Sequence, residues 1–254
     1  MSANAAAPLG TPRVHLRRTD STNERARTLA GAGAPHGTLV TAAEQTAGRG
    51  RQGRRWSAPA GSSLLASLIL APAPRLLPLA AAVAVCDAVD VLRDPAKTGS
   101  ATIKWPNDIV LAQGPGLAKL AGILIEARPQ QGWAVLGIGL NAAVDLDELP
   151  AELHGTAASL ELGPEGIEPL LSELLVALER RLAEPAEETL AAWGQRDALR
   201  GRTISWASPG ETQDGGRTEG VAQGIDGDGR LVVALAGGGR TALGAGEVHL
   251  RPLG

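Results

Sequence analysis

Gly48-Arg49-Gly50-Arg51-Gln52-Gly53-Arg54-Arg55-Trp56 is the stretch that says most about this chain. Four arginines and three glycines occupy these nine residues, with no acidic residue among them. Arginine supplies a permanent positive charge and a planar set of donors that matches phosphate or carboxylate. Glycine lets backbone N–H groups come close to an anion. This composition is typical of a loop that closes over a small phosphorylated ligand, although a basic run taken alone is more often a solvated surface or a nucleic-acid patch.

The same stretch satisfies a dinucleotide-binding pattern, because glycines stand at 48, 50 and 53 after a predicted strand over 38–47. In that pattern the last glycine opens a helix whose N-terminus meets the pyrophosphate. Here Pro59 would stop such a helix almost at once, and no acidic residue stands at the ribose-binding distance on a second strand. We therefore reject a Rossmann fold. A P-loop is excluded because the chain has no Gly-x-x-x-x-Gly-Lys-Ser/Thr motif.

Composition narrows the class of protein. The 254 residues suffice for one large domain, or one large and one small, and 44% of them are hydrophobic. A formal charge of −3 argues against a general nucleic-acid binder. The single cysteine, Cys86, rules out a disulfide within the chain and predicts a reducing cytoplasm, with Cys86 filling a helix core. No signal peptide or membrane-spanning segment is recognisable.

Hydrophobic periodicity outlines two regions. Strands are predicted over 14–18, 38–47, 62–71, 101–104, 108–111, 120–127 and 133–140, and helices over 21–30, 76–92, 167–181 and 187–195. Ser21 is predicted to cap the first helix in a capping box with Glu24. After Gly201, five short segments between glycine-rich turns predict a small barrel: 203–206, 220–225, 231–235, 240–243 and 248–250. We expect a disordered leader over 1–12, an α+β domain over 13–198 and the barrel over 201–254.

Four polar motifs accompany the basic loop, and each alone has a structural explanation. They are Asp20-Ser21-Thr22-Asn23, Ala43-Glu44-Gln45-Thr46, Lys104-Trp105-Pro106-Asn107-Asp108 and the run from Lys119 to Glu126, followed by Gly137-Ile138-Gly139-Leu140-Asn141 on the next strand. The first is an ordinary helix start. A lysine that begins an apolar strand, as Lys119 does, is usually an exposed strand end. If Lys119 faces a pocket, it becomes a fixed positive charge for an anionic reacting group.

Taken in order, these motifs resemble the biotin protein ligase family, over roughly residues 14–250. The resemblance implies a mixed β-sheet packed with helices, of the class II synthetase-like type, followed by an SH3-like β-barrel. It also implies an ATP-dependent ligase that converts biotin to biotinyl-5′-AMP. Such an enzyme then transfers biotin to a specific lysine of a biotin carboxyl carrier protein, which belongs to acetyl-CoA carboxylase or a related carboxylase.

The resemblance also implies the site. Lys119 would be the main electrostatic catalyst, assisted by Arg49 and Arg51. The implied biotin-binding residues are Ser21, Thr22, Asn23, Gln45, Arg49, Gly50, Arg51, Lys119 and Gly122. The implied ATP- and adenylate-binding residues are Arg51, Arg54, Trp56, Asn107, Asp108, Lys119 and Asn141. Trp105 is expected in the core beside the site. Mg²⁺ would accompany ATP; its ligands are not assigned, with Asp108 as a candidate.

Two features depart from the family pattern. Many members carry an N-terminal helix-turn-helix that represses transcription, whereas only about a dozen residues precede the matched region here. We therefore expect a monofunctional enzyme with no DNA partner. Some members stack adenine on an aromatic side chain, but 142–157 contains no Phe, Tyr or Trp, so what holds the adenine stays open.

Two other functions remain as alternatives. A lipoate or octanoate ligase or transferase shares the catalytic fold but generally lacks the Gly-Arg-Gly-Arg loop. A nucleic-acid-binding protein could use the arginines, and its affinity would fall steeply with salt. For the ligase, the expected partners are biotin, ATP and the carrier protein, with no membrane. The sequence does not decide between a monomer and a weak homodimer.

Overall fold

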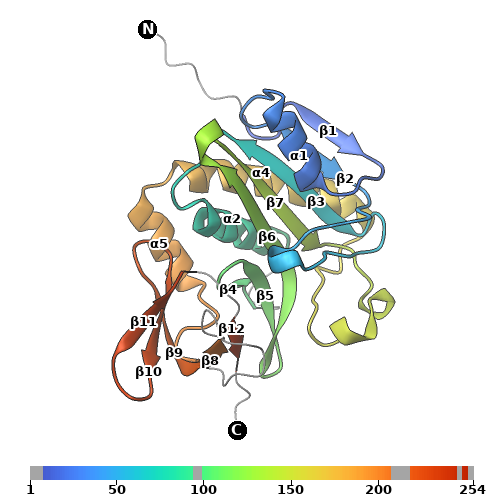
Figure 1. Ribbon diagram of the computed structural model, residues 1–254. Coiled ribbons are helices and arrows are strands. Elements are labelled where there is room, and N and C mark those ends of the chain that lie inside the picture. Colours follow the sequence, from blue (N-terminus) through green and yellow to red (C-terminus); the bar gives the residue numbers. More distant parts are fainter. Residues whose placement is uncertain (1–7, 94–98, 207–217, 245–247, 251–254) are drawn as a thin grey trace.

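The computed structural model describes residues 8–93, 99–206, 218–244 and 248–250, which form two sheets and the helices around them (Figure 1). The large sheet contains β1 (Arg13–Leu16), β2 (Leu39–Ala42), β3 (Ser63–Leu70), β4 (Thr102–Lys104), β5 (Asp108–Gln113), β6 (Gly116–Arg128) and β7 (Trp133–Asn141). The helices are α1 (Thr22–Gly31), α2 (Leu77–Leu92), α4 (Ile167–Ala183) and α5 (Ala186–Gln195). The small sheet contains β8 (Thr203–Trp206), β9 (Thr218–Ile225), β10 (Leu231–Leu235), β11 (Arg240–Leu243) and β12 (Val248–Leu250).

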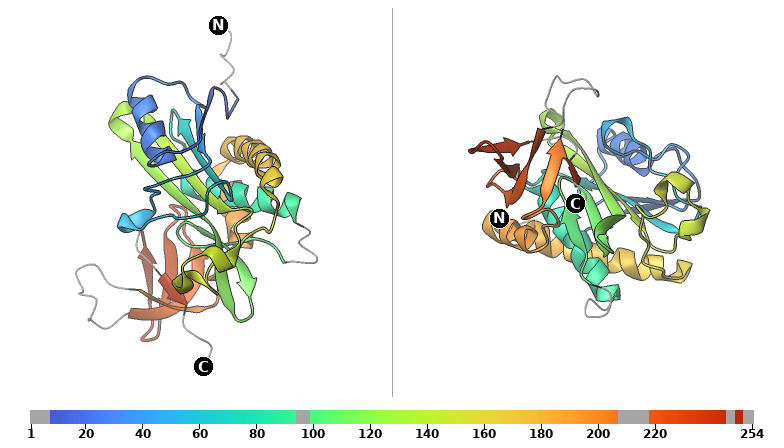
Figure 2. Two further views of the ribbon diagram at one scale, coloured as in Figure 1. Left: turned by 90° about the vertical axis from the view of Figure 1, so that its right-hand side faces the viewer. Right: turned by 90° about the horizontal axis from the view of Figure 1, so that it is seen from below.

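The large sheet is mixed, in the order β1-β2-β3-β7-β6-β5-β4. β1 runs parallel to β2, and the other neighbouring strands are antiparallel. Figure 2 shows α1 on one face of this sheet and α2 with α4 on the other. All eight residues of β3 are buried, because β3 is a central strand covered on both faces. Strands in this position have a nearly continuous apolar sequence.

The two faces of β3 carry different side chains. Leu68 and Leu70 pack into the main core with α2 and α4, while Ile69 packs against α1 in a smaller cluster. Ser67 is a buried polar residue of this strand, and its hydroxyl reaches the first turn of α1. The period-2 alternation of β3 therefore sends one polar group toward the α1 side of the sheet.

Charged side chains join the helices behind the sheet. Asp87 of α2 accepts hydrogen bonds from Arg180 Nη2 (2.8 Å), Arg181 Nε (2.7 Å) and Arg196 Nη2 (2.9 Å). Asp90, one turn further along α2, pairs with Arg196 at 2.6 Å. Because these carboxylates are largely shielded from solvent, the contacts are screened less by salt than surface pairs. They tie α2, α4 and the end of α5 into one support for the sheet.

The C-terminal sheet has the order β11-β10-β9-β8-β12 with antiparallel neighbours. It is consistent with the expected SH3-like barrel, although the described residues do not close the strands into a ring. Its core side chains join the main core of the large domain. The turn between β9 and β10 docks through Gly229 O, which accepts from Trp105 Nε1 at 3.1 Å, and through Asp228, which pairs with Arg75 at 2.6 Å.

Each strand and helix predicted from periodicity is present; the ends are shifted in the large domain, whereas β8, β10, β11 and β12 have the predicted bounds. The strand expected over 38–47 ends at Ala42, and the chain beyond it turns toward the basic loop. β6 begins at Gly116, so Lys119 lies inside the strand and not at its start. Among the described residues, none of the helices has the length and apolar character needed to cross a bilayer.

The N-terminal predictions need two corrections. Ser21 precedes α1, but its side chain forms no capping hydrogen bond; Glu24 instead pairs with Arg27 at 3.1 Å, so the predicted capping box is wrong. Residues 1–7 of the predicted disordered leader lie outside the described residues. Within that leader, Leu9 N donates to Glu179 Oε1 and Gly10 N donates to Gly37 O. Residues 9 and 10 of the predicted leader therefore contact the domain through hydrogen bonds from their backbone N–H groups.

Candidate active site

A cavity opens between the start of α1, the basic loop, the β4–β5 turn and the facing strands β6 and β7. Its walls carry hydrogen-bonding side chains at one end and cationic side chains at the other. The lining residues are Ser21, Thr22, Asn23, Gln45, Arg49, Gly50, Arg51, Gln52, Arg54, Arg55, Trp56, Lys104, Trp105, Pro106, Asn107, Asp108, Lys119, Gly122, Ile123, Leu124, Gly137, Ile138, Gly139 and Val248.

The amide end of the cavity consists of Ser21, Thr22, Asn23 and Gln45. Gln45 Oε1 accepts from Thr22 N (2.7 Å) and Thr22 Oγ1 (3.0 Å), which fixes the Gln45 amide against the first turn of α1. These side chains are neutral and mostly buried. Buried donors and acceptors carry a cost when unpaired, so this end suits a neutral ligand with both N–H and C=O groups.

A glycine makes room for Asn23. Gly137 of β7 faces this side chain, and a Cβ at that position would overlap the Asn23 amide. Asn23 Nδ2 also donates to Leu124 O (3.4 Å) and Glu126 Oε2 (3.0 Å) on β6. The small residue at 137 therefore allows α1 to bring its amide directly onto the sheet surface.

The basic loop forms a short hairpin. Gly50 N donates to Arg54 O (2.7 Å), and Trp56 N donates to Gly48 O (2.9 Å). Gly48 is needed for this approach, because a Cβ there would lie 2.5 Å from Trp56 O. Arg51 Nη1 donates to Asn107 Oδ1 at 3.3 Å. This contact links the hairpin to the turn between β4 and β5, on the other side of the cavity.

Lys119 and Asp108 form the cationic end together with Arg51. Lys119 Nζ lies 2.6 Å from Asp108 Oδ1. The Lys119 backbone is fixed on one edge by segment 156–158, through hydrogen bonds of 2.7 and 2.8 Å. Burial lowers the pKa of the Arg51 guanidinium, an effect that the nearby Asp108 carboxylate opposes. Arg51 remains charged because its ordinary value is far above neutral.

The Trp56 ring covers two glycines of the sheet. A Cβ at Gly139 would lie 2.7 Å from Trp56 Cε2, and one at Gly122 would lie 3.3 Å from Trp56 Cζ3. Lys119 Nζ lies 5.8 Å from the ring centre, within cation–π range. Trp56 Nε1 is buried and has no hydrogen-bond partner among the described residues. Trp56 therefore anchors the hairpin on the strands and forms an apolar wall beside the cation.

The cavity gathers the residues predicted from sequence, with one exception. Asn141 does not line it: Asn141 Nδ2 donates to Ala158 O at 2.9 Å, and Asn141 Oδ1 lies 3.5 Å from Ser63 Oγ. Its side chain instead joins β7 to the segment after it. Trp105 is buried beside the site, as expected.

Several residues that line or support the cavity were not among those predicted from the sequence. Val248 reaches the cavity from β12 of the C-terminal sheet, and nothing in its local sequence distinguishes it from a core valine. Gly137 and Gly139 had a usable signal in the Gly-Ile-Gly run. Glu126 stands outside the cavity but contacts Asn23 and Arg49; an acidic residue at the end of an apolar strand gives little hint of such contacts.

The sequence does not assign the ligands of a Mg²⁺ ion, apart from Asp108 as a candidate. The described residues contain no group of three or more His, Cys, Asp or Glu side chains placed to hold a metal ion. Asp108 is the acidic residue that the cavity lining contains. A single carboxylate fits the way Mg²⁺ is usually bound, through one or two carboxylates plus substrate phosphates and water.

Comparison with known proteins places this cavity in a family. Residues 15–142 match the Biotin/lipoate A/B protein ligase family, and residues 211–251 match the Biotin protein ligase C terminal domain. A biotin–[acetyl-CoA-carboxylase] ligase from Mycobacterium tuberculosis is 39% identical over 250 residues, covering 92% of this chain and 87% of that protein.

Two solved structures extend the likeness to the whole fold. The biotin protein ligase from Aquifex aeolicus in complex with biotin and ATP has a TM-score of 0.74 at 25% identity, covering 95% of this chain and 99% of that one. The biotin protein ligase from Leishmania major in complex with biotinyl-5-AMP has a TM-score of 0.62 at 26% identity, covering 92% and 99%. The chain belongs to the biotin protein ligase family.

Proposed function

We propose that this chain activates biotin with ATP to biotinyl-5′-AMP and passes the biotinyl group to a specific lysine of a biotin carboxyl carrier protein. The observation that carries the proposal is the single cavity with a neutral amide end and a cationic end. Biotin has the matching polarity, with a neutral ureido ring at one end and a carboxylate at the other. The amide end would receive the ureido ring, and the cationic end would receive the carboxylate and the phosphates of ATP.

In the first step a biotin carboxylate oxygen attacks the α-phosphorus of ATP. A C(O)O–P bond forms, the bond from the α-phosphorus to the bridging oxygen breaks, and pyrophosphate leaves. Both reactants are anionic, so fixed positive charge must be present before they meet. Lys119 and Arg51 supply it, and Asp108 holds the Lys119 ammonium in place at 2.6 Å.

The amide end selects the ring. Hydrogen bonds within the protein hold the side chains of this end in place before any ligand arrives. Thr22 pairs with Gln45, and Asn23 pairs with Glu126. A ligand that left the remaining buried donors and acceptors of these side chains unpaired would lose about 1–3 kcal/mol for each one. The Trp56 ring and the glycines at 122 and 139 would enclose the apolar part of biotin. Lipoate lacks ureido N–H and C=O groups, so the amide end disfavours it.

The basic loop protects the intermediate. Biotinyl-5′-AMP is a mixed anhydride that water hydrolyses, so the site must exclude solvent until the carrier arrives. Trp56 on the sheet and Arg51 on Asn107 hold the hairpin at two points. In the second step the carrier lysine, as the neutral amine, attacks the carbonyl carbon; an amide bond forms and AMP leaves.

Mg²⁺ would neutralise phosphate charge in the first step, with Asp108 as the protein carboxylate available to it. The adenine would bind near Arg54 and Asn107, at the cationic end. We place the activity in the cytoplasm, because carrier domains and a reduced, buried Cys86 fit that compartment.

The activation step is tested by exchange of radiolabelled pyrophosphate into ATP. Biotin should stimulate the exchange in the presence of Mg²⁺, whereas lipoate and octanoate should not. Stimulation by lipoate alone would move the chain to the lipoate branch of the fold. No exchange with any of these acids, together with salt-sensitive binding of an oligonucleotide, would favour nucleic-acid binding instead.

A further inference from the structure

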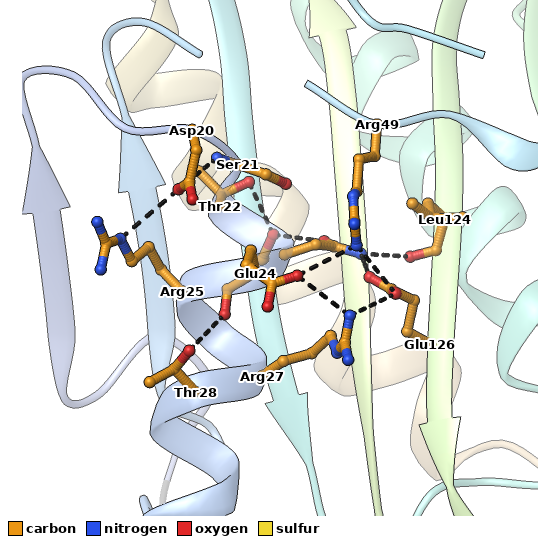
Figure 3. A network of polar contacts seen from close by, with 12 residues as sticks. Asp20, Ser21, Thr22, Glu24, Arg25, Arg27, Thr28, Arg49, Leu124 and Glu126 are labelled. Atoms are coloured by element: carbon orange, nitrogen blue, oxygen red, sulfur yellow. Dashed lines mark hydrogen bonds and ion pairs between the residues drawn. The ribbon is translucent and has the colours of Figure 1, made fainter. Parts of the chain in front are cut away.

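Arg49 of the basic loop is held between two carboxylates from different elements. Its Nη1 lies 3.1 Å from Glu24 Oε2 on α1 and 3.8 Å from Glu126 Oε1 on β6. Arg27 Nη1 contacts the same two oxygens, at 3.1 and 3.2 Å. Figure 3 shows Arg49 entering this cluster from the loop and Arg27 from α1. The two arginines and two glutamates balance in charge and tie the loop to both elements.

Glu126 is the more shielded of the two carboxylates. Its side chain is 23% exposed, against 39% for Glu24. Contacts to a shielded charge are screened less by solvent and salt, whereas exposed pairs contribute little. Arg49 donates its hydrogen bond to Glu24, and the shielded Glu126 adds an ion pair with Arg49 and a hydrogen bond from Arg27.

Glu126 also reaches the amide end of the cavity through its second oxygen. Glu126 Oε2 accepts from Asn23 Nδ2 at 3.0 Å. An ionised carboxylate only accepts hydrogen bonds, so the Asn23 N–H₂ group must face Glu126. The Asn23 carbonyl oxygen must then face Ser67 Oγ, which lies 2.7 Å away.

Ser67 connects the Asn23 amide to Thr22 and, through Thr22, to Gln45. Ser67 Oγ lies 2.8 Å from Thr22 Oγ1, and Thr22 contacts Gln45. Thr22 Oγ1 donates its single proton to Gln45 Oε1, so the Thr22 oxygen is an acceptor for Ser67, whose one hydroxyl proton is shared between Thr22 Oγ1 and Asn23 Oδ1. Glu126 thus sets the orientation of the Asn23 amide, and the Ser67 hydroxyl connects that amide to Thr22.

We propose that Glu126 is a positioning residue that couples the biotin pocket to the basic loop, holding Asn23 with one carboxylate oxygen and Arg49 with the other. The inference rests on the proposed function. Glu126 contacts no reacting atom; it acts through Asn23 and Arg49. The position of Asn23 and the placement of the loop are then linked, because both use the same carboxylate.

The atoms used by each glutamate supply a matched control. Glu24 contacts both arginines through the same oxygen, Oε2, so glutamine at 24 keeps an acceptor for both and loses only charge. Glu126 needs Oε1 for the arginines and Oε2 for Asn23. Glutamine at 126 has one acceptor oxygen, so it can serve either the arginines or Asn23, but not both. The two substitutions change charge equally and differ in this second contact.

The test compares Glu126→Gln with Glu24→Gln in the full chain. Glu126→Gln should raise the Kd for biotin by calorimetry, and the KM for biotin, about tenfold, the loss expected for one hydrogen bond to a charged group. Its KM for ATP should rise less than its KM for biotin, because the expected ATP-binding residues Asn107 and Asp108 lie outside the elements that carry the cluster. Glu24→Gln should raise the biotin Kd about threefold at most, as for an exposed pair.

A double-mutant cycle tests whether Glu126 affects biotin binding through Asn23. In an Asn23→Ala background, Glu126→Gln should change the biotin Kd much less than in the unaltered chain, since the coupled contact is already gone. A biotin Kd unchanged by Glu126→Gln, equal effects of the two glutamine substitutions, or parallel changes in both KM values would overturn the inference. Failure of the unaltered chain to bind biotin would instead refute the proposed function, so the two failures are distinguishable.

Discussion

Lys119 Nζ lies 2.6 Å from Asp108 Oδ1, and the two residues come from neighbouring strands of one sheet. β5 and β6 pair with a register irregularity at Ile109 and Val110, next to this contact. Strand pairing therefore fixes the ammonium at the cationic end before substrates arrive. Preorganised charge of this kind lowers the barrier for reactions between anions, because no reorganisation is needed at the moment of reaction.

Replacing that ammonium should abolish activation. We expect Lys119→Ala to lower biotin-dependent pyrophosphate exchange by at least about 10²–10³-fold, the usual effect of removing one preorganised electrostatic group. The far-UV circular dichroism and the unfolding midpoint should stay close to those of the unaltered chain, because the Lys119 side chain is partly exposed. Near-normal exchange by the folded variant would show that Lys119 is not the main electrostatic catalyst.

The tether from Arg51 to Asn107 predicts a leak when it is cut. We expect Arg51→Gly to loosen the hairpin, since the 3.3 Å contact is lost and glycine adds backbone freedom. Biotinyl-5′-AMP should then escape and label bystander lysines, which is measured by biotin incorporation into added serum albumin. The control is Arg202→Ala, a half-buried arginine outside the cavity. Equal labelling by both variants would contradict a closing role for the loop.

The glycine under Trp56 predicts a steric effect on biotin binding. A methyl group at Gly139 would lie 2.7 Å from the indole ring, so Gly139→Ala should displace Trp56 and cost about 1–3 kcal/mol in unfolding free energy, as overpacking does. The biotin Kd should rise as well. The control is Gly194→Ala in α5, where the nearest atom lies at 3.7 Å; it should gain stability and keep the wild-type Kd. Normal biotin affinity in Gly139→Ala would refute the Trp56 wall.

The buried thiol predicts a pH dependence of stability. Cys86 is fully buried, and this burial raises its pKa. The unfolded thiol ionises above its ordinary value of about 8.5 while the native thiol stays protonated. The unfolded state then binds fewer protons, so Cys86 should lower the stability as the pH rises above that value.

The effect is isolated by comparing the chain with Cys86→Ala in urea unfolding at pH 7 and pH 10. The difference in unfolding free energy between the two proteins should shift by about 1.4 kcal/mol per pH unit above the unfolded pKa. Native Cys86 should also resist thiol reagents at pH 8 and react after unfolding in urea. Rapid modification of the native protein would show that the site is accessible.

Local sequence predicted the strands and helices because most of them pack against the core, and this packing gives each one a recognisable apolar pattern. β3 reads as one apolar run and α2 as an alanine- and valine-rich helix, so composition identified both. The end of the strand at Ala42 was missed because 43–47 contains no glycine or proline that would stop a strand pattern. Its departure toward the loop is set by contacts with residues 19 and 20, which are tertiary.

Motif order predicted most of the site, since polar residues at strand and helix ends gather at one edge of a sheet. Asn141 lies outside the cavity lining, and its role toward ATP stays a prediction, because a terminal amide has the same sequence appearance whether it faces a ligand or the Ala158 carbonyl. Val248 and Glu126 were missed for a related reason: their roles depend on pairings between segments far apart in the chain. Such pairings leave no local pattern to read.

The most direct test of the account is mass spectrometry of a carrier domain incubated with this protein, ATP and Mg²⁺. If the protein is a biotin ligase, we expect a mass gain of one biotinyl group on a single lysine of a biotin carboxyl carrier domain. This gain should depend on ATP and biotin, and it should be lost in Lys119→Ala. No gain with biotin, but an ATP-dependent gain when lipoate and a lipoyl domain are supplied, would contradict it.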